Sequence, residues 1–550
     1  LGWSADSTNG PTSTVPAGLT DGIDAVAVDN NLDNIIYNYS VTNNQSLILA
    51  ALVDPGNWGG DNTTPQTLGR PIGTFSCTTP GDCFDLLSWN GTVWTAIIGS
   101  KTFPDISTAV ILDADYNTSI DPGFTACSID IPNTITLTVA NDTFIVVQND
   151  ITVDGNLIVE TRGNFVQNDD GGNVIIDGSG SCTLNKTTPF KYEWYYYTYW
   201  GSPVTSETIG NVFPLVASDR RFSYNAANFL DNSPTDDVDD NNDDWEIAAG
   251  VDTMIPGVGY AVTAAKTGFV PGPDNISFTG TFNTGDIPVA ITFDPANLGI
   301  RWNFIANPYP SAVDFVAFHL ANSSVLEGVA YFWSQASPPL ASYPGNSQLN
   351  FNPDDHAVFN VGVGGTDGGG AGVIPNGYVP SAQGFFIPAL NIGTATFTNA
   401  MRTPDNTSNS QFFKGAGSKK SNPNTSNNPL ENRLWVDLTS DNGVFNQILI
   451  GYVDNATDDY DGMAYDAPKI VSPGFAAVLY SSIENDDVKY VIQGKDINSI
   501  NENEVIKLGF STTIEVDTEY TFSISQLQGD FLTENSIYLN DNLLNIQHNL

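Results

Sequence analysis

The residues with the clearest capacity for chemistry lie in an acidic run at 236–245, which reads DDVDDNNDDW. Oxygen-bearing side chains alternate along it, a spacing that lets a looping chain wrap a hard cation such as Ca²⁺: Asp237, Asp239, Asn241 and Asp243. Two positions depart from a calcium loop, because Asn242 stands where Gly is usual and Ala248 where a bidentate Glu is usual. The run therefore predicts either a calcium site or a solvated acidic loop. A second acidic turn, 458–462, is a further candidate for cation binding, although an ordinary turn is favoured.

The four cysteines carry a second kind of chemistry. Cys77 and Cys83 flank a Pro-Gly turn that could bring their Cβ atoms within disulfide range, so we predict a small loop-closing disulfide in an oxidising compartment. Cys127 and Cys182 lie in strand-like segments and are read as small buried hydrophobic residues. The chain has no CxxC pair, which argues against a zinc ribbon.

The candidates for catalysis are few. The three histidines, His319, His356 and His548, lie in separate segments, and neither a G-x-S-x-G elbow nor an H-E-x-x-H helix accompanies them. Any two of 62 acidic residues could be proposed as a glycosidase pair, so such a proposal would carry no information. We therefore expect a protein that is not an enzyme and that has no cofactor beyond the possible Ca²⁺.

Composition narrows the class of protein. Lys and Arg total 18 against 62 Asp and Glu, and the net charge of -44 would repel nucleic-acid phosphates and anionic lipid. Only 15% of residues are charged, aromatic residues reach 11%, and turn-forming residues are abundant. This mixture is typical of short strands joined by tight turns. No apolar run is long enough to span a bilayer as a helix.

Strand-like runs of period two predict an all-β, multidomain fold with one short helix. We expect an N-terminal β module at 1–85 and a repetitive module at 86–185, whose turn residues recur often enough for a short β-solenoid or a meander. A large β-rich module follows at 186–414, then a linker at 415–432 and a C-terminal β-sandwich at 433–550. The helix is placed at 311–321, with Ser311 as its cap and Val313, Val316, Ala317 and Leu320 on its buried stripe.

An aromatic run opens the large module, with the sequence YYYTYW at 195–200. Alternate aromatic residues on a buried strand need no ligand, so core packing is favoured over a sugar-binding platform. If the protein binds glycans, the exposed stacking surfaces would be Trp58, Trp89, Trp94 or Trp333.

The chain after residue 186 contains a series of distinctive stretches: YTYWGSP (197–203), DRRF (219–222), PGVGY (256–260), ANPYPS (306–311), QGFF (383–386) and SQFFK (410–414). Through these stretches, residues 186–550 resemble the C-terminal regions of large surface proteins that the type IX secretion system exports in gliding, flavobacterium-like bacteria. Residues 537–550 look like the penultimate strand region of the family's C-terminal sorting domain. The final strand pair of that domain is absent, so we expect a truncated domain or a processed fragment.

The resemblance implies an extracellular or cell-surface location and a structural or adhesive role. The expected partners are the outer-membrane secretion machinery, surface glycans, and further copies of the chain in a fibre, since unpaired strand edges can add neighbouring strands. The alternative is a carbohydrate-binding accessory protein of a secreted complex. Neither nucleic acid nor membrane insertion is expected.

Overall fold

A computed structural model describes the backbone of six strands between residues 2 and 76, and all atoms of residues 83–232, 239–341, 343, 347–411, 430–471 and 476–550. The chain divides into two compact units, Leu1–Phe84 and Asp85–Leu550. The described elements are mostly strands, with three short helices, so the all-β prediction is confirmed. None of the helices in these residues has the length and apolar character to cross a membrane.

The first unit contains three antiparallel strand pairs. They are β1 (Gly2–Asp6) with β2 (Gly10–Thr14), β3 (Ile23–Val28) with β4 (Ile35–Tyr39), and β5 (Ser46–Leu52) with β6 (Leu68–Ser76). The boundary after Phe84 agrees with the module end that the turn-rich sequence predicts.

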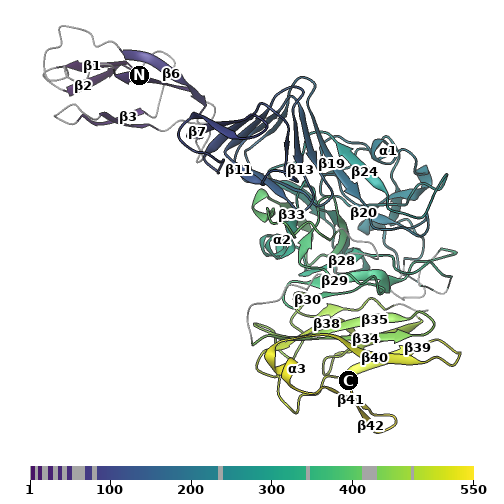
Figure 1. Ribbon diagram of the computed structural model, residues 1–550. Coiled ribbons are helices and arrows are strands. Elements are labelled where there is room, and N and C mark those ends of the chain that lie inside the picture. Colours follow the sequence, from purple (N-terminus) through teal and green to yellow (C-terminus); the bar gives the residue numbers. More distant parts are fainter. Residues whose placement is uncertain are drawn as a thin grey trace. The chain divides into compact units, whose positions relative to one another are not determined.

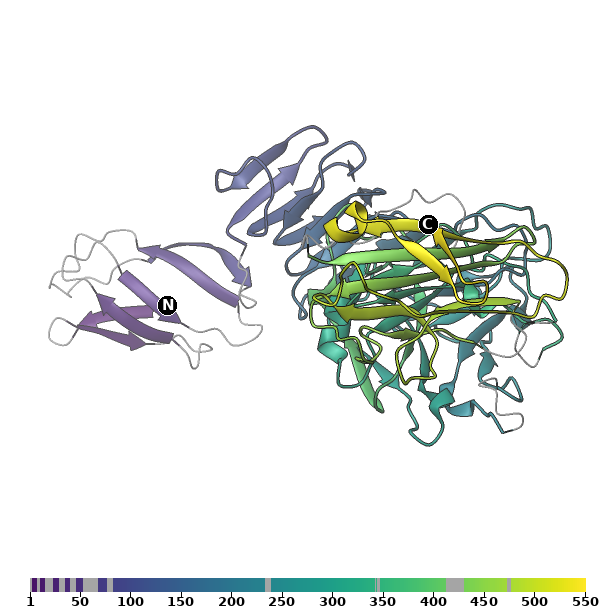
Figure 2. The same ribbon diagram turned by 90° about the horizontal axis from the view of Figure 1, so that it is seen from below.

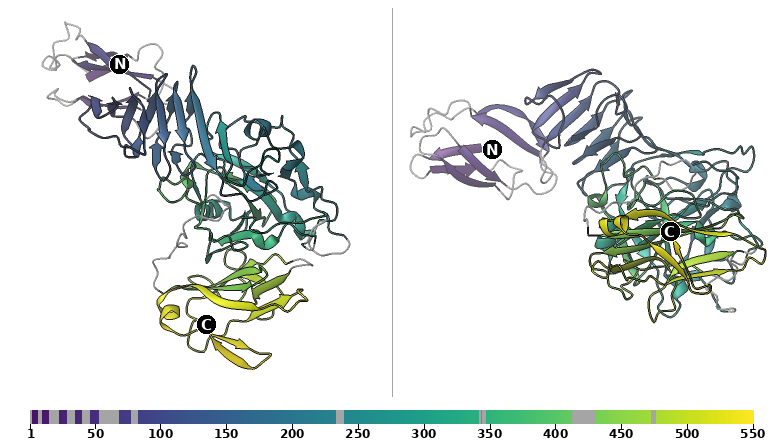
Figure 3. Two further views of the ribbon diagram at one scale, coloured as in Figure 1. Left: turned by 45° about the vertical axis from the view of Figure 1, so that its right-hand side comes forward. Right: turned by 60° about the horizontal axis from the view of Figure 1, so that its bottom comes forward.

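A β-solenoid opens the second unit, and its coils are visible as stacked arrows in Figures 1 and 3. Equivalent strands of successive coils pair in parallel, as where Ile129 lies opposite Ile151 and Ile151 opposite Val174. The solenoid prediction is therefore confirmed over the meander. Its three sheets contain β7 (Asp85–Trp89), β8 (Trp94–Ile98), β9 (Thr108–Leu112), β12 (Ser128–Ile131), β15 (Ile151–Val153) and β18 (Val174–Ile176); β10 (Tyr116–Asn117), β13 (Thr136–Val139), β16 (Asn156–Val159) and β19 (Ser181–Thr187); and β11 (Phe124–Ala126), β14 (Phe144–Val147) and β17 (Asn164–Gln167).

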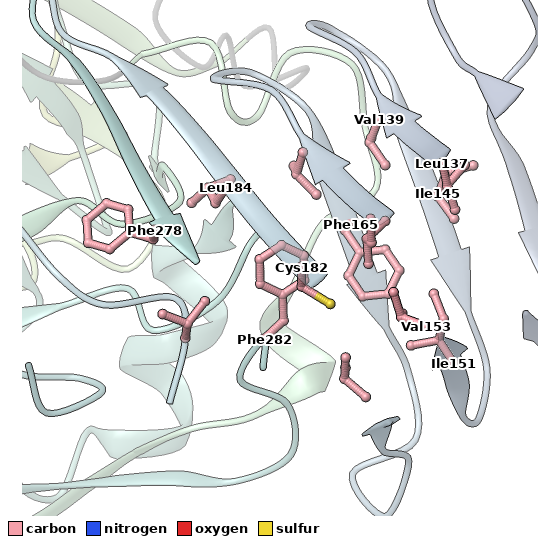
Figure 4. Packing of buried hydrophobic residues seen from close by; sticks show 14 of the residues in the cluster. Leu137, Val139, Ile145, Ile151, Val153, Phe165, Cys182, Leu184, Phe278 and Phe282 are labelled. Atoms are coloured by element: carbon pink, nitrogen blue, oxygen red, sulfur yellow. The ribbon is translucent and has the colours of Figure 1, made fainter. Parts of the chain in front are cut away.

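Alternation of side chains explains the solenoid core. In β13 and β16 every second residue is fully buried, because successive residues of a strand point to opposite faces. No coil can bury its inward face alone, so each one depends on its neighbours. The last coil is covered by β24 (Asn275–Thr279), which pairs antiparallel with β19. Figure 4 shows the core continuing past this point, from Phe165 and Cys182 to Phe278 and Phe282.

The large module follows the solenoid and contains two main sheets. The first orders β20 (Thr198–Trp200), β23 (Tyr260–Val262), β21 (Arg221–Tyr224) and β22 (Trp245–Ile247). The second orders β26 (Trp302–Ala306), β32 (Gly384–Pro388), β28 (Val329–Trp333), β29 (His356–Asn360) and β30 (Gly364–Thr366). Two strand pairs accompany them, β25 (Ile287–Ile291) with β33 (Gly393–Phe397) and β27 (Val313–Asp314) with β31 (Tyr378–Val379).

The helices are short. α1 spans Ile209–Val212, α2 spans Phe315–Asn322 and α3 spans Asp530–Glu534, and single 3₁₀ turns occur at Ser218–Arg220, Ala226–Asn228, Leu298–Arg301, Pro353–Asp355 and Asn399–Met401.

The predicted start of α2 was wrong. Asp314 is the cap, because its Oδ1 accepts from the amides of Val316 at 2.8 Å and Ala317 at 3.1 Å. The helix buries Phe315 and Phe318, and the stripe predicted from Val313 to Leu320 is not its buried face, since Leu320 is 69% exposed.

The C-terminal part forms a seven-stranded sheet, whose long strands lie side by side in Figure 2. Six strands run in the order β39 (Leu508–Thr512), β37 (Ala477–Ser481), β38 (Tyr490–Asp496), β35 (Phe445–Val453), β34 (Asn432–Ser440) and β40 (Tyr520–Gln528), and β36 (Ala467–Pro468) pairs with β38. The hairpin of β41 (Tyr538–Asp541) and β42 (Ile546–Asn549) is separate. One face of the sheet packs on β28 and β29, so the large module provides the second layer of this sandwich-like arrangement.

Candidate functional site: two buried junctions

The acidic run is only partly inside the described residues, because Asp237 lies outside them. Asp239 is 8% exposed, and its carboxylate accepts from the amides of Leu230 (2.8 Å), Asn241 (3.2 Å) and Asn242. Asn242 adopts a positive φ of 60°. Asn241 Oδ1 accepts from the amide of Asp243 at 3.1 Å, so loop amides already engage these oxygens.

Burial and the nearby charge of Asp239 raise the pKa of Asp244 to about 6. Over the residues that the structure describes, no three His, Cys, Asp or Glu side chains gather as a metal-binding group. Calcium binding by Asp237, Asp239, Asn241 and Asp243 stays a prediction.

The cysteines differ from the sequence expectation. Cys83 and Cys127 are both disulfide-bonded, whereas Cys182 is free and fully buried. Cys77, the predicted partner of Cys83, lies outside the described residues. The prediction that Cys182 is a small buried hydrophobic residue is confirmed. Cys127 is also buried, but it forms a disulfide, so the prediction that it is only a hydrophobic residue was wrong. A buried strand residue and a disulfide-bonded one look the same in a local sequence pattern.

Of the four tryptophans proposed as glycan-stacking surfaces, those within the described residues have little exposed surface. Trp89 is 5% and Trp333 is 4% exposed, Trp94 packs against the solenoid core, and Trp58 lies outside the described residues. Trp333 belongs to an aromatic cluster with Tyr199, Phe304 and Phe386. Trp89 and Trp333 therefore stabilise cores, and the same is true of the inner half of the aromatic run, where Tyr199 is 6% and Trp200 is 1% exposed.

The histidines lie on different elements: His319 on α2, His356 on β29 and His548 on β42. His356 is buried in an aromatic environment, 4.9 Å from the Trp333 ring, and burial lowers its pKa to about 4. Its Nδ1 lies 3.2 Å from the Pro353 carbonyl oxygen, which can only accept, so the neutral ring carries its proton on Nδ1. This histidine therefore packs as a neutral aromatic ring at physiological pH.

Sequence reasoning missed the coil junction, where the last solenoid coils meet the large module through Asn164, Lys186, Ser381, Arg402 and Asn409. Arg402 is buried, and no carboxylate among the described residues forms an ion pair with it. Its guanidinium donates to the Phe165 carbonyl at 2.6 Å, to Ser311 Oγ at 3.0 Å and to Asn399 Oδ1 at 2.9 Å. It also stacks on the Tyr309 ring at 4.7 Å. Burial lowers its pKa to about 10, so the group stays charged at neutral pH.

Lys186 is the second cation of the coil junction. Its Nζ donates to the Thr161 carbonyl at 2.8 Å and to Ser381 Oγ at 2.9 Å. Burial lowers its pKa to about 7, with a smaller contribution from the charge of Arg162. Asn409 completes this group, since its Nδ2 donates to the Gly163 carbonyl at 2.7 Å and its Oδ1 accepts from the Ser381 amide at 2.9 Å.

Asn164, at the start of β17, also forms hydrogen bonds across the coil junction. Its Oδ1 accepts from the Ala312 amide and its Nδ2 donates to the Asp405 carbonyl, each at 2.8 Å. In the turn that follows β17, the Asp169 carbonyl accepts from Asn399 Nδ2 at 2.9 Å. Residues 403–411 therefore belong to the folded module. The predicted linker at 415–432 lies almost wholly outside the described residues, and β34 begins at Asn432.

A second contact, the sheet junction, joins the large module to the C-terminal sheet. Trp435 is fully buried, and its indole donates to the Gly365 carbonyl at 2.8 Å. Asp354 and Lys469 form an ion pair of 2.9 Å, with side chains 8% and 6% exposed. The Asp367 amide donates to Gln447 Oε1 at 2.8 Å.

A small cavity of about 20 Å³ lies at the sheet junction among Asp354, His356, Asp367 and Lys469. Such a volume has room for about one water molecule. Burial raises the pKa of Asp367 to about 6. The polar groups at both junctions are thus arranged to fasten modules together, with little space for a small-molecule substrate at the sheet junction.

A family model described as a domain of unknown function (DUF8693) matches residues 88–550. No curated protein and no solved structure gives a significant match. The matched range begins within β7 and includes the solenoid, the large module and the C-terminal sheet.

Proposed function

We propose that this chain, which belongs to the DUF8693 family, is a cell-surface structural and adhesive protein exported by type IX secretion. Its role is to hold binding surfaces outside the cell on a rigid body. The observation that carries the structural part is the coil junction, where buried side chains from residues 161–186 and 381–409 hydrogen-bond one another. Such contacts oppose hinge motion between solenoid and module, because separating them would leave buried polar groups without partners.

The charge supports an extracellular role in a second way. With a net charge of -44, neighbouring copies repel one another at low ionic strength, which keeps a densely displayed protein soluble. The export route rests on the resemblance of residues 186–550 to type IX secreted surface proteins. The secretion machinery of the outer membrane is accordingly the first partner that the proposal assigns.

The export route can be tested in the source bacterium by surface labelling. An epitope-tagged full-length protein is expected on intact cells, where added protease removes it, and is expected to remain inside when a core component of the secretion system is deleted. A periplasmic marker controls for leakage. Unchanged surface exposure in the deletion strain would refute the export route.

The structural role has a separate test on purified protein. Buried contacts at both junctions predict that the second unit unfolds in one cooperative calorimetric transition. Independent transitions for the solenoid and the C-terminal sheet would contradict a rigid body.

A further inference from the structure

Aromatic residues just before the aromatic run, together with its first residue, lie at the surface beside two cations and form the Trp194 face: Phe190, Tyr192, Trp194, Tyr195, Arg220 and Lys266. Tyr192 is 58% and Phe190 is 38% exposed, and their rings lie 4.9 Å apart. The rings of Trp194 and Tyr195 lie 5.8 Å apart, and both residues are partly exposed. Exposed aromatic rings at neighbouring positions need an explanation, because burying them would otherwise be favourable.

Two cations lie against this aromatic group. Lys266 Nζ is 4.8 Å and Arg220 Cζ is 6.0 Å from the centre of the Trp194 ring, within the range of cation–π attraction. The chain has only 18 Lys and Arg residues, so two on one tryptophan are a local concentration. Asp219, 3.4 Å from Arg220, and the exposed Glu193 offset them. The face is therefore near neutral on a molecule whose net charge is -44.

The backbone holds the Trp194 face in place between β19 and β20. Lys191 forms a bridge with Gly272, and its buried Nζ pairs with Asp274 at 3.0 Å. The Trp194 carbonyl accepts from the Ala264 amide at 3.0 Å, which fixes the segment to the strand that precedes Lys266. A fixed segment loses little conformational entropy when a ligand binds, so this surface is preorganised.

We propose that the Trp194 face binds an acidic polysaccharide. Sugar rings present apolar C–H faces that pack on aromatic rings, and Tyr192 and Phe190 offer such rings to solvent. A carboxylate on the sugar can accept hydrogen bonds from the Arg220 guanidinium and the Lys266 ammonium. Elsewhere the acidic surface would repel the same polymer, so charge selects this face as the docking position. This inference deepens the proposed adhesive role and rests on it.

The test measures binding of full-length protein to a polyuronate, alginate, by affinity electrophoresis and calorimetry, with dextran as the neutral comparison. Binding to alginate is expected and binding to dextran is not, because only alginate has carboxylates that can accept hydrogen bonds from Arg220 and Lys266. Y192A and K266E should each weaken alginate binding by about tenfold. The matched controls, Y538A and K507E, change a similarly exposed tyrosine and lysine on the C-terminal sheet and its hairpin, and should leave binding unchanged.

Three outcomes would overturn the proposal: no binding to alginate, equal binding to dextran, or unchanged binding in both Y192A and K266E. Tyr192 is exposed enough for Y192A to fold, which circular dichroism checks. Failure here is distinguishable from failure of the proposed function, because surface labelling of the exported protein does not depend on the Trp194 face.

Discussion

Lys186 is a buried amine, 1% exposed, and its titration should be visible in the stability of the protein. The folded pKa is about 7, below the ordinary value of 10.5, because burial disfavours the charged form. Folding therefore releases a proton between these pKa values, and stability from this group rises with pH across that window. Between pH 7 and pH 9 the gain should be about 2 kcal/mol.

K186M should abolish that gain while keeping most of the side-chain volume. Guanidinium unfolding at pH 7, 8 and 9 gives the unfolding free energy of each protein. The contribution of Lys186 is the difference between the wild type and K186M in how steeply this free energy rises with pH. K507M, which changes an exposed lysine, is expected to retain the wild-type slope. Parallel wild-type and K186M profiles would mean that Lys186 is not desolvated in the folded protein.

Asp367 titrates with the opposite effect on stability. Burial raises its folded pKa from 3.8 to about 6, so the fold favours the protonated acid and loses stability as pH rises from about 4 to about 6. The loss should reach about 3 kcal/mol at most. Asp244 and Asp466, with pKa values raised to about 6 and about 7, act in the same direction.

D367N should therefore reduce the loss of unfolding free energy that the wild type shows as pH rises from about 4 to about 6. Urea unfolding at pH 4.5 and 7.5 is expected to show a smaller loss for D367N than for the wild type. D441N, in the exposed turn between β34 and β35, is the control and should lose as much as the wild type. An equal loss in D367N and the wild type would show that Asp367 is solvated.

At the scale of elements, the spacing between solenoid coils leaves no room for a side chain at Gly155. A Cβ there would lie 2.1 Å from the Ile135 carbonyl oxygen and 2.5 Å from that of Pro132, both backbone atoms of the preceding coil. G155A should cost more than about 3 kcal/mol of unfolding free energy, because coils must separate.

Gly443 is the matched control for Gly155. Its φ is 94° and nothing lies within 4 Å of its Cβ position, so G443A carries only the backbone penalty of about 1 kcal/mol. Thermal denaturation of both variants compares the two effects. If G155A were no worse than G443A, the coils would be packed less closely than the structure indicates.

Local periodicity was enough to predict the strands but not their partners. Alternating residues at 136–139 and 156–159 indicated strands that need a stacked neighbour, and the solenoid follows from that. The cap of α2 was misplaced because both Ser311 and Asp314 suit a helix start, and Ser311 instead accepts from Arg402. The coil junction was missed because its residues are far apart in sequence, as Asn164 and Asp405 are, and carry no local signature.

The aromatic run was predicted correctly as core only in part. Its alternation from Tyr197 to Trp200 suits a buried strand, and Tyr199 and Trp200 are buried. Phe190 and Tyr192, which precede the run and lie before β20, are exposed. Sequence composition could not place that boundary, because exposure there depends on which segments of the large module pack above it.

At the scale of the whole molecule, one question is whether the interface between the C-terminal sheet and the large module is tightly packed and buried or loose and hydrated. The shared core of Tyr331, Val358, Trp435 and Leu449 indicates tight packing, and the buried Asp354–Lys469 ion pair crosses the same sheet junction. Removing one partner leaves the other charge buried, so D354A and K469A should each cost about 3 kcal/mol.

The double variant D354A/K469A should cost less than the sum of the singles, because it leaves no lone charge. A coupling of about 2 kcal/mol is expected from chemical denaturation of all four proteins. The control cycle uses Lys101 and Asp105, a more exposed pair at 2.6 Å, where the coupling should be much smaller because water screens the charges. Equal coupling in both cycles would mean that water reaches the sheet junction. The C-terminal sheet could then detach without unfolding the large module, contrary to a rigid body.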